Sequence, residues 1–406
     1  MSPDFFWKER SSETRYSRQE LIAGWKQATL ASASVLVVGA GALGNEVLKN
    51  LALTGVGQID VADFDVVEIS NLSRCVLFRE EDLGCNKAEI AAMRLREMNP
   101  SLRCRAFPIN AEHKLGAGRM RRYDLVLGAV DTIAARLALN RLCRMAGVPF
   151  LDGGMNADGG QVSLFHPHES SCYQCGMTES MWARVAQRNG CLQQGTGEEE
   201  KPVKLPATVT MAASIGAMQA QEAIRWLLRE NDGTAQALRP GERICFQSAP
   251  YQVLVLQSAV RQDCEVHGFN RVLLAMLEAD SATITVSQLL EQFEAKRLVL
   301  DWDVIFMLEC FDCSRELVTL PIFELARERL ICEKCGRIRV PEMKSNIAAD
   351  DILAGCTLRE LGVPDQAILE LVLRDRSEDS EGCSIFAELC GEHTEVPNTL
   401  QLGVSA

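Results

Sequence analysis

The sequence lacks any continuous apolar run of the roughly 18 residues that a membrane-spanning helix requires. Its opening stretch, MSPDFFWKERSSETRYSRQE, mixes both charge signs and lacks the apolar centre of a signal peptide. We therefore expect a cytoplasmic protein without a membrane partner.

Positive charge is also in short supply. The chain has 42 Lys and Arg residues against 55 Asp and Glu, a net charge of -13 and a pI of about 5.1. Electrostatic repulsion then disfavours broad contact with nucleic acid or anionic lipid. We expect no nucleic-acid partner.

Internal repeats and a phosphate-binding loop of the form G-x-x-x-x-G-K-[ST] are absent too. The second absence excludes a P-loop ATPase. What remains is a chain of 406 residues, 47% hydrophobic and 24% charged, which is typical of a folded protein with more than one domain. We predict two domains, residues 1–270 and 271–406.

Residues 33–65 are predicted to form a strand, a glycine turn, a helix and a second strand. Gly39, Gly41 and Gly44 have the G-x-G-x-x-G spacing, in which missing side chains let backbone amides approach a phosphate. Asp63 ends the second strand, where it can accept hydrogen bonds from ribose hydroxyls. The pattern predicts an α/β domain with a Rossmann-like, mostly parallel sheet. Glycines that serve only helix–strand packing are the alternative.

The ribose of NAD and that of ATP fit Asp63 equally well. Arg74 and Lys87 follow the second strand, and cations there suit a triphosphate better than a hydride carrier, although either could be solvated surface. Asp131 follows another apolar strand, 125–130, at a carboxyl end where such sheets bind ligands. Asp131 could hold Mg²⁺, or cap the helix that begins at Thr132, and the two roles are compatible.

Seven motifs occur in the order found in one enzyme superfamily: RYSRQ (15–19), GAGALGNE (39–46), DFDVVEISNLSRC (63–75), GCNKA (84–88), DTIAARLALN (131–140), CYQC (172–175) and MAASIGAMQAQEAIRWLL (211–228). They resemble the adenylation domain of ubiquitin-activating-type enzymes, a superfamily that includes the molybdopterin-synthase and thiamine sulfur-carrier adenylyltransferases. The resemblance covers roughly residues 10–270.

This resemblance implies ATP-dependent adenylation of the C-terminal glycine of a ubiquitin-like protein, with release of pyrophosphate. It assigns the nucleotide contacts to five side chains: Asp63 for the ribose, Asn71, Arg74 and Lys87 for the phosphates, and Asp131 for Mg²⁺. It also implies that Arg18 reaches into the site of a neighbouring subunit, so a homodimer is expected. Cys75 stands where the family often has Gln, which leaves that one contact unassigned.

Several of the 16 cysteines form C-x-x-C pairs, which in a reducing compartment indicate metal binding. Cys172 and Cys175 form half of a knuckle, and Cys264 and His267, with the same gap, form the other half. The resembling enzymes commonly carry a second C-x-x-C there, and a histidine remains a normal zinc ligand. Four protein ligands predict a structural zinc; loss of the metal is the alternative.

A second set of cysteines has the C-x-x-C-x18-C-x-x-C spacing of a zinc ribbon: Cys310, Cys313, Cys332 and Cys335. We predict that it both stabilises a smaller α+β zinc-ribbon domain and presents a docking surface. In this domain we expect two helical segments and a strand over 271–310. Two short helices should follow, opening with the Thr357-x-x-Glu360 capping box.

Cys191 belongs to neither set. It lies in a crossover segment, about 176–210, where the resembling enzymes carry the thiol that receives the activated tail. We predict a thioester on Cys191 and transfer to a conjugating enzyme, as in prokaryotic ubiquitin-like conjugation systems, some of which are linked to antiviral defence. The alternatives are sulfur transfer for cofactor or thionucleoside synthesis, in which Cys191 could hold sulfur or be dispensable, a zinc-binding scaffold with a dead nucleotide site, and an NAD oxidoreductase. Cys191 could also be an inert cysteine.

Overall fold

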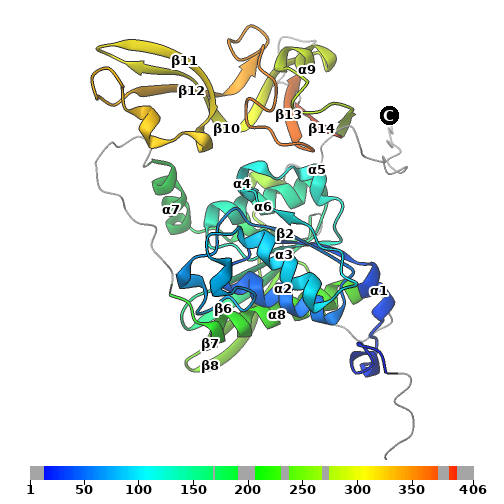
Figure 1. Ribbon diagram of the computed structural model, residues 1–406. Helices are drawn as coiled ribbons and strands as arrows, with labels where there is room; N and C mark the ends of the chain where they lie inside the picture. Colours follow the sequence, from blue (N-terminus) through cyan, green and yellow to red (C-terminus); the bar gives the residue numbers. More distant parts are fainter. Residues whose placement is uncertain are drawn as a thin grey trace, which may run out of the picture. The chain divides into compact units, whose positions relative to one another are not determined.

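The computed structural model describes residues 13–167, 170–190, 206–229, 237–267, 274–373 and 384–390 (Figure 1). It divides into two compact units. The first comprises Met1–Glu112 and Met120–Asn270, and the second comprises His113–Arg119 and Arg271–Ala406. The segment His113–Arg119 thus belongs with residues much later in the chain, which the sequence did not indicate.

Within the described part of the first unit, one sheet has eight strands in the order β3-β2-β1-β4-β5-β6-β7-β8. Their bounds are β1 Ser34–Val38, β2 Gln58–Ala62, β3 Ala106–Phe107, β4 Leu125–Gly128, β5 Phe150–Met155, β6 Gly159–Phe165, β7 Glu242–Ser248 and β8 Tyr251–Gln257. Strands β1 to β5 pair in parallel, and β5 to β8 pair antiparallel. The predicted α/β fold with a mostly parallel sheet is confirmed.

Helices connect these strands, and several of them contribute buried apolar residues to the core of the first unit. Their bounds are α1 Gln27–Ser32, α2 Ala42–Thr54, α3 Lys87–Met98, α6 Ile133–Ala146, α7 Glu179–Gly190 and α8 Val209–Leu228, with 3₁₀ turns η2 Gln19–Leu21, η3 Ile69–Asn71, η4 Glu80–Asp82 and η5 Tyr173–Gly176. In β1, Val35, Leu36 and Val37 have no exposed surface. A parallel strand covered on both faces needs apolar residues at every position, which explains the continuous run. Two short helices, α4 Ala111–Lys114 and α5 Ala117–Met120, occur where the chain passes between units.

Strand β8 is the last strand of the sheet, and all seven of its residues are exposed. They include apolar side chains that alternate between the two faces of the strand, such as Val253 and Leu254, which are 58% and 54% exposed.

Among the described residues, no helix is both long and apolar enough to cross a membrane.

The described part of the second unit contains a sheet in the order β11-β10-β13-β14-β9, with β12 also paired to β10. The bounds are β9 Leu274–Leu277, α9 Val286–Gln292, β10 Ala295–Cys310, β11 Ser314–Pro321, β12 Val340–Ala348, β13 Ile368–Leu373 and β14 Ser384–Leu389, with 3₁₀ turns η7 Ile322–Glu324 and η8 Arg327–Leu330. Within this unit, the His113 ring stacks on Phe323 at 4.1 Å, and the Gly118 amide donates to the Gln366 carbonyl at 2.8 Å.

Two predictions for this unit are wrong. The first expected helical segment contains strand β9. Of the two short helices expected after the capping box, the first is a turn over 358–362 and the second is strand β13. Thr357 and Glu360 do bond reciprocally, at 2.7 and 3.3 Å, but Gly362, at a φ of 86°, reverses the chain after one turn. In β13 the apolar residues pair with β10 and β14 instead of following a helical period.

Candidate functional site

The glycine turn lies between β1 and α2, and its three glycines differ in what surrounds them. A Cβ on Gly39, which has a φ of +97°, would lie 2.5 Å from the Ala129 carbonyl oxygen. A Cβ on Gly44 would lie 1.9 Å from the Gly39 carbonyl oxygen. Gly41 caps α2, and nothing lies within 4 Å of its Cβ position. Close packing therefore requires Gly39 and Gly44, whereas the space at Gly41 is open to a ligand.

Asp63 follows β2 and lies against this turn. Its Oδ2 accepts from the Ala40 amide at 2.7 Å, and its Oδ1 accepts from the Asp65 amide at 2.9 Å. Burial raises the pKa of Asp63, while the two amides and the nearby Lys87 ammonium oppose the rise. The carboxylate is thus oriented beside the place where a nucleotide phosphate would meet Gly41.

The predicted phosphate-binding residues lie on the segments that follow. The Asn71 side chain is buried in η3 and accepts from the Glu68 amide at 2.9 Å. Arg74 donates through Nη1 to the Ser70 carbonyl. Asn71 therefore shapes the turn before Arg74 and is already engaged through its carbonyl oxygen.

Lys87 is the first residue of α3 and is paired in the free protein. Its Nζ lies 2.8 Å from Asp65 Oδ2. The N-cap of α3, Asn86, donates to the carbonyls of Asp63 and Asp65 at 3.1 Å each. Sequence reasoning missed Asp65 and Asn86; the signal was present, since Asn is a preferred helix N-cap and Asp65 lies two residues after Asp63.

A further missed residue is Asn45, in the first turn of α2. It has no exposed surface, and its amide donates to the carbonyls of Ala40 and Gly41 at 2.6 and 3.1 Å. Its Oδ1 accepts from the Leu77 amide at 2.9 Å. Asn45 therefore links the glycine turn to the segment that follows Arg74.

Asp131 is exposed in the loop between β4 and α6. The predicted capping role is wrong, because Thr132 is the N-cap of α6 and its Oγ1 accepts from the Ala135 amide at 3.1 Å. The same loop adjoins the glycine turn, since a Cβ on Gly39 would lie 3.3 Å from the Val130 nitrogen. Asp131 is thus an exposed carboxylate in a loop whose preceding residue lies beside the turn, with the Arg136 guanidinium in electrostatic range.

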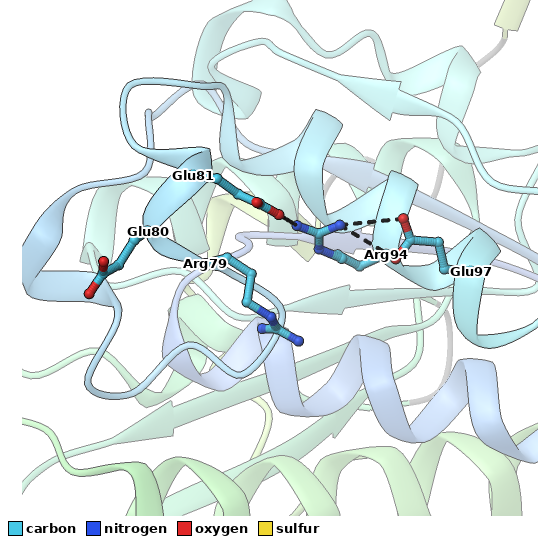
Figure 2. A pocket seen from close by; sticks show the side chains of 5 residues that line it. All are labelled: Arg79, Glu80, Glu81, Arg94 and Glu97. Carbon is cyan, nitrogen blue, oxygen red and sulfur yellow. Dashed lines mark hydrogen bonds and ion pairs between the residues drawn. The ribbon is translucent and has the colours of Figure 1, made fainter.

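Arg18 lies apart from this group. Its side chain is 87% exposed, and its Nη2 lies 3.5 Å from Glu13 Oε1. A pocket of about 320 Å³ lies elsewhere, at η4 and α3, and is lined by Arg79, Glu80, Glu81, Arg94 and Glu97. Figure 2 shows the guanidinium of Arg94 held between Glu81 and Glu97, at 3.0 and 3.3 Å. Glutamates outnumber arginines in this lining, and none of the predicted nucleotide-binding residues belongs to it, so we do not assign the nucleotide to this pocket.

The first predicted metal set comes together in the first unit. The ligand atoms of Cys172, Cys175, Cys264 and His267 all lie within 4.8 Å of one another. Cys172 Sγ is 3.6 Å from Cys264 Sγ and 3.8 Å from Cys175 Sγ. Two thiolates at about 2.3 Å from one Zn²⁺ would be about 3.8 Å apart, so the donors fit a tetrahedral zinc.

Asn140 provides a second test of this fit. Its Nδ2 is buried and has no hydrogen-bond partner among the described residues. Burial and the neighbouring Cys175 raise the pKa of Cys172, and the Asn140 side chain is one of the groups that oppose this rise. Burial and the neighbouring thiols raise the pKa of Cys264 to about 12. A metal ion would displace these protons, and the Cys172 thiolate could then accept from Asn140.

The second metal set comes together in the second unit. The Sγ atoms of Cys310, Cys313, Cys332 and Cys335 all lie within 4.8 Å of one another, and those of Cys310 and Cys335 are 3.6 Å apart. The Cys332 carbonyl accepts from the Gly336 amide at 2.8 Å, and Gly336 has a φ of 70°. Backbone amides lower the pKa of Cys332 to about 6. These are the tight turns of a zinc ribbon, and the residues fit Zn²⁺.

Comparison with known proteins identifies the family. A protein-family model described as "ThiF family" matches residues 16–269. The chain belongs to the ThiF family. This finding and the relatives below confirm the resemblance to the ubiquitin-activating-type superfamily.

Three curated relatives of this ThiF-family chain represent different branches. SUMO-activating enzyme subunit 2 of Dictyostelium discoideum is 39% identical over 142 residues, covering 35% of this chain and 22% of that protein. The sulfur carrier protein adenylyltransferase of Thermus thermophilus is 38% identical over 169 residues, covering 40% and 62%. The SAMP-activating enzyme E1 of Haloferax volcanii is 31% identical over 271 residues, covering 63% and 88%. The chain therefore spans less than two thirds of the first two relatives.

Among solved structures, E. coli MccB with ATP is 23% identical, with a TM-score of 0.52, covering 64% of this chain and 75% of that one. That likeness concerns the fold alone. The ThiF match includes the first metal set and ends before the second, so the ribbon is an addition to the family domain. Cys191, which follows α7 in the sequence, lies outside the described residues.

Proposed function

We propose that this protein is an ATP-dependent activating enzyme that adenylates the C-terminal glycine of a ubiquitin-like protein. The observation that carries the proposal is the Asp63 carboxylate, held by the Ala40 amide at 2.7 Å beside the open position at Gly41. Arg74 and Lys87 follow on adjacent segments, and the chain belongs to the ThiF family.

In this proposal each side chain has one task at the nucleotide. Asp63 accepts hydrogen bonds from the ribose, and Arg74 and Lys87 neutralise phosphate charge. Lys87 exchanges Asp65, now 2.8 Å away, for a phosphate oxygen when ATP binds. Asp131 would hold Mg²⁺, which when bound neutralises charge at the reacting phosphorus.

The first step is an attack at phosphorus. A carboxylate oxygen of the carrier's C-terminal glycine bonds to the α-phosphorus, and the bond from that phosphorus to the oxygen shared with the β-phosphate breaks. Pyrophosphate leaves with the electron pair. Arg18 from a second subunit would add positive charge to the site, which makes the enzyme a homodimer in this proposal.

The second step uses Cys191. Its thiol gives its proton to water, the sulfur attacks the carbonyl carbon of the acyl adenylate, and AMP leaves with the electron pair of the broken C–O bond. A thiolate of a conjugating enzyme then attacks the same carbonyl carbon, the bond from that carbon to the Cys191 sulfur breaks, and Cys191 leaves as a thiolate.

Two exposed surfaces are available for protein partners. We assign the ubiquitin-like protein to β8, where an edge strand can pair with a partner's backbone and apolar side chains such as Val253 and Leu254 stand exposed. We assign a conjugating enzyme to the zinc ribbon, where Phe311 and Leu317 are 78% and 68% exposed.

The test combines exchange of pyrophosphate into ATP with a non-reducing gel and intact mass measurement. The full chain is mixed with ATP, Mg²⁺ and each ubiquitin-fold protein encoded beside it, as wild type, Cys191→Ala and the control Cys85→Ala. Cys85 is an exposed thiol, so its loss controls for adventitious adducts. We expect exchange in all three proteins, and an ATP-dependent, dithiothreitol-sensitive adduct in wild type and Cys85→Ala only.

The sulfur-carrier adenylyltransferase is the second candidate, because the Thermus relative carries that name and is as similar as the SUMO-activating subunit. It predicts exchange without an adduct on Cys191, and a thiocarboxylate on the carrier when a sulfur donor is supplied. Absence of exchange with every carrier would refute both candidates and favour a scaffold.

A further inference from the structure

The side chain of Asn45, in the first turn of α2, bonds to two separate segments of the nucleotide site. Its Nδ2 donates to the carbonyls of Ala40 and Gly41 at 2.6 and 3.1 Å. Its Oδ1 accepts from the Leu77 amide at 2.9 Å, and the residue has no exposed surface. Neither the family resemblance nor the reaction described above assigns Asn45 a role.

The first two bonds fix the direction of two peptide groups in the glycine turn. In a planar trans peptide, the carbonyl and the amide point in opposite directions. Holding the Ala40 carbonyl therefore turns the Gly41 amide away from Asn45. The Gly41 carbonyl also accepts from the Asn45 backbone amide at 2.9 Å, which turns the Ala42 amide away in the same manner. These two amides lie at the N-terminus of α2, where such groups lack helical partners and can bind phosphate.

The third bond fixes the segment that carries Arg74. Leu77 has no exposed surface, so without Asn45 its amide would lose a buried acceptor. Arg74 precedes Leu77 by three residues, at most about 11 Å of chain. The Arg74 amide itself donates to the Asn71 carbonyl at 3.0 Å. The position of Arg74 relative to the glycine turn therefore depends on Asn45.

We propose that Asn45 is a positioning residue for the phosphates of ATP. It orients the Gly41 and Ala42 amides and sets their separation from Arg74, so that all three act on one phosphate chain. Asp63, the proposed ribose ligand, keeps its own two backbone bonds at 2.7 and 2.9 Å. Loss of Asn45 should therefore impair phosphate binding and spare the nucleoside. The inference rests on the proposed nucleotide site.

The decisive variant is Asn45→Ala, which removes all three side-chain bonds. Asn45→Ser is milder, because a serine hydroxyl can still donate to the Gly41 carbonyl one turn back while the other two bonds are lost. The matched control is Asn99→Ala, at the C-terminal end of α3. Asn99 is 2% exposed, and its Nδ2 donates to the Tyr16 hydroxyl and the Ala52 carbonyl at 3.0 Å each. Both alanine variants should lose stability, because each side chain bonds a buried carbonyl.

Affinities for ATP with Mg²⁺ and for adenosine are measured on the full chain by calorimetry. We expect Asn45→Ala and Asn45→Ser to weaken ATP binding at least about tenfold and to keep adenosine binding within about twofold of wild type. Asn99→Ala should bind both ligands as wild type does. When Arg74→Ala is already present, the loss of ATP affinity caused by Asn45→Ala should be at least about threefold smaller, because the two residues act together.

Equal losses for ATP and adenosine would indicate a general structural role and overturn the proposal. Additive losses in the double variant would also overturn it, since Asn45 would then act independently of Arg74. If Asn45→Ala does not fold, wild-type ATP affinity in Asn45→Ser is the result that refutes the inference. Absence of ATP binding in wild type would refute the nucleotide site and the proposed function as well, whereas normal ATP binding in the Asn45 variants would refute this inference alone.

Discussion

The glycine turn allows a sharp test, because two of its glycines should respond in opposite ways to the same added methyl group. Gly41→Ala places Cβ where nothing lies within 4 Å, at a φ of -71° that alanine adopts readily. Alanine is a poorer N-cap than glycine but restricts the unfolded chain more, and the two effects, each under about 1 kcal/mol, oppose one another. We expect the melting temperature to stay within about 3 °C of wild type.

Gly44→Ala should fail for a different reason. Its Cβ would lie 1.9 Å from the Gly39 carbonyl oxygen, so α2 must move away from the turn. Overpacking of this kind costs about 3 kcal/mol or more, which lowers the melting temperature of a domain this size by roughly 6–12 °C.

ATP affinity separates the two effects. If the open space at Gly41 receives a phosphate, Gly41→Ala should weaken ATP binding at least about tenfold, a loss of about 1.4 kcal/mol, in a protein that is otherwise stable. Isothermal titration calorimetry measures the affinity and differential scanning calorimetry the stability. Gly355→Ala, in the second unit and equally without neighbours, is the matched control and should change neither. Wild-type ATP affinity in Gly41→Ala would refute the assignment of the turn.

Three further predictions concern buried charge and metal. Burial raises the pKa of Asp152 to about 6. Because the pKa of Asp152 is higher in the folded than in the unfolded protein, its ionisation opposes folding more and more as the pH rises. The unfolding free energy of wild type minus that of Asp152→Asn, measured by urea titration, should therefore fall by about 2 kcal/mol between about pH 4.5 and about pH 8. A difference that stays constant with pH would contradict this. Asp63→Asn should weaken ATP binding about tenfold or more by calorimetry. Burial also raises the pKa of Asp63, so the ATP affinity of wild type should begin to fall on acidification at a higher pH than an exposed aspartate would give. If the ATP affinity of Asp63→Asn falls over the same pH range, the titrating group is a different residue. Cys313→Ser should lower bound zinc from about two ions per chain to one by elemental mass spectrometry and leave ATP affinity unchanged; loss of both ions would show that the two sites are not independent.

Local patterns account for the parts of the fold that were predicted correctly. The apolar run of β1, the glycines that follow and the apolar period of α2 lie within a few residues of one another, so their signal survives in the sequence. The same holds for the two C-x-x-C pairs of the ribbon, whose spacing reflects the tight turns that a metal requires.

Short apolar runs were less informative. Leu274–Leu277 and Ile368–Leu373 were read as helical, yet both are strands of the second sheet. Four to six apolar residues fit either element, and pairing with distant strands decides between them.

By itself, the sequence determined the family, the Rossmann-like sheet, and the residue types that could bind a nucleotide and two metal ions, because these depend on order and spacing along the chain. Only the tertiary structure decided that Asp65 pairs with Lys87, that the buried Asp152 pairs with Arg136, and that His113–Arg119 joins the second unit. The reason is physical: burial, the partner of a charge and the direction of a side chain are set by residues that are distant along the chain and meet only when it folds.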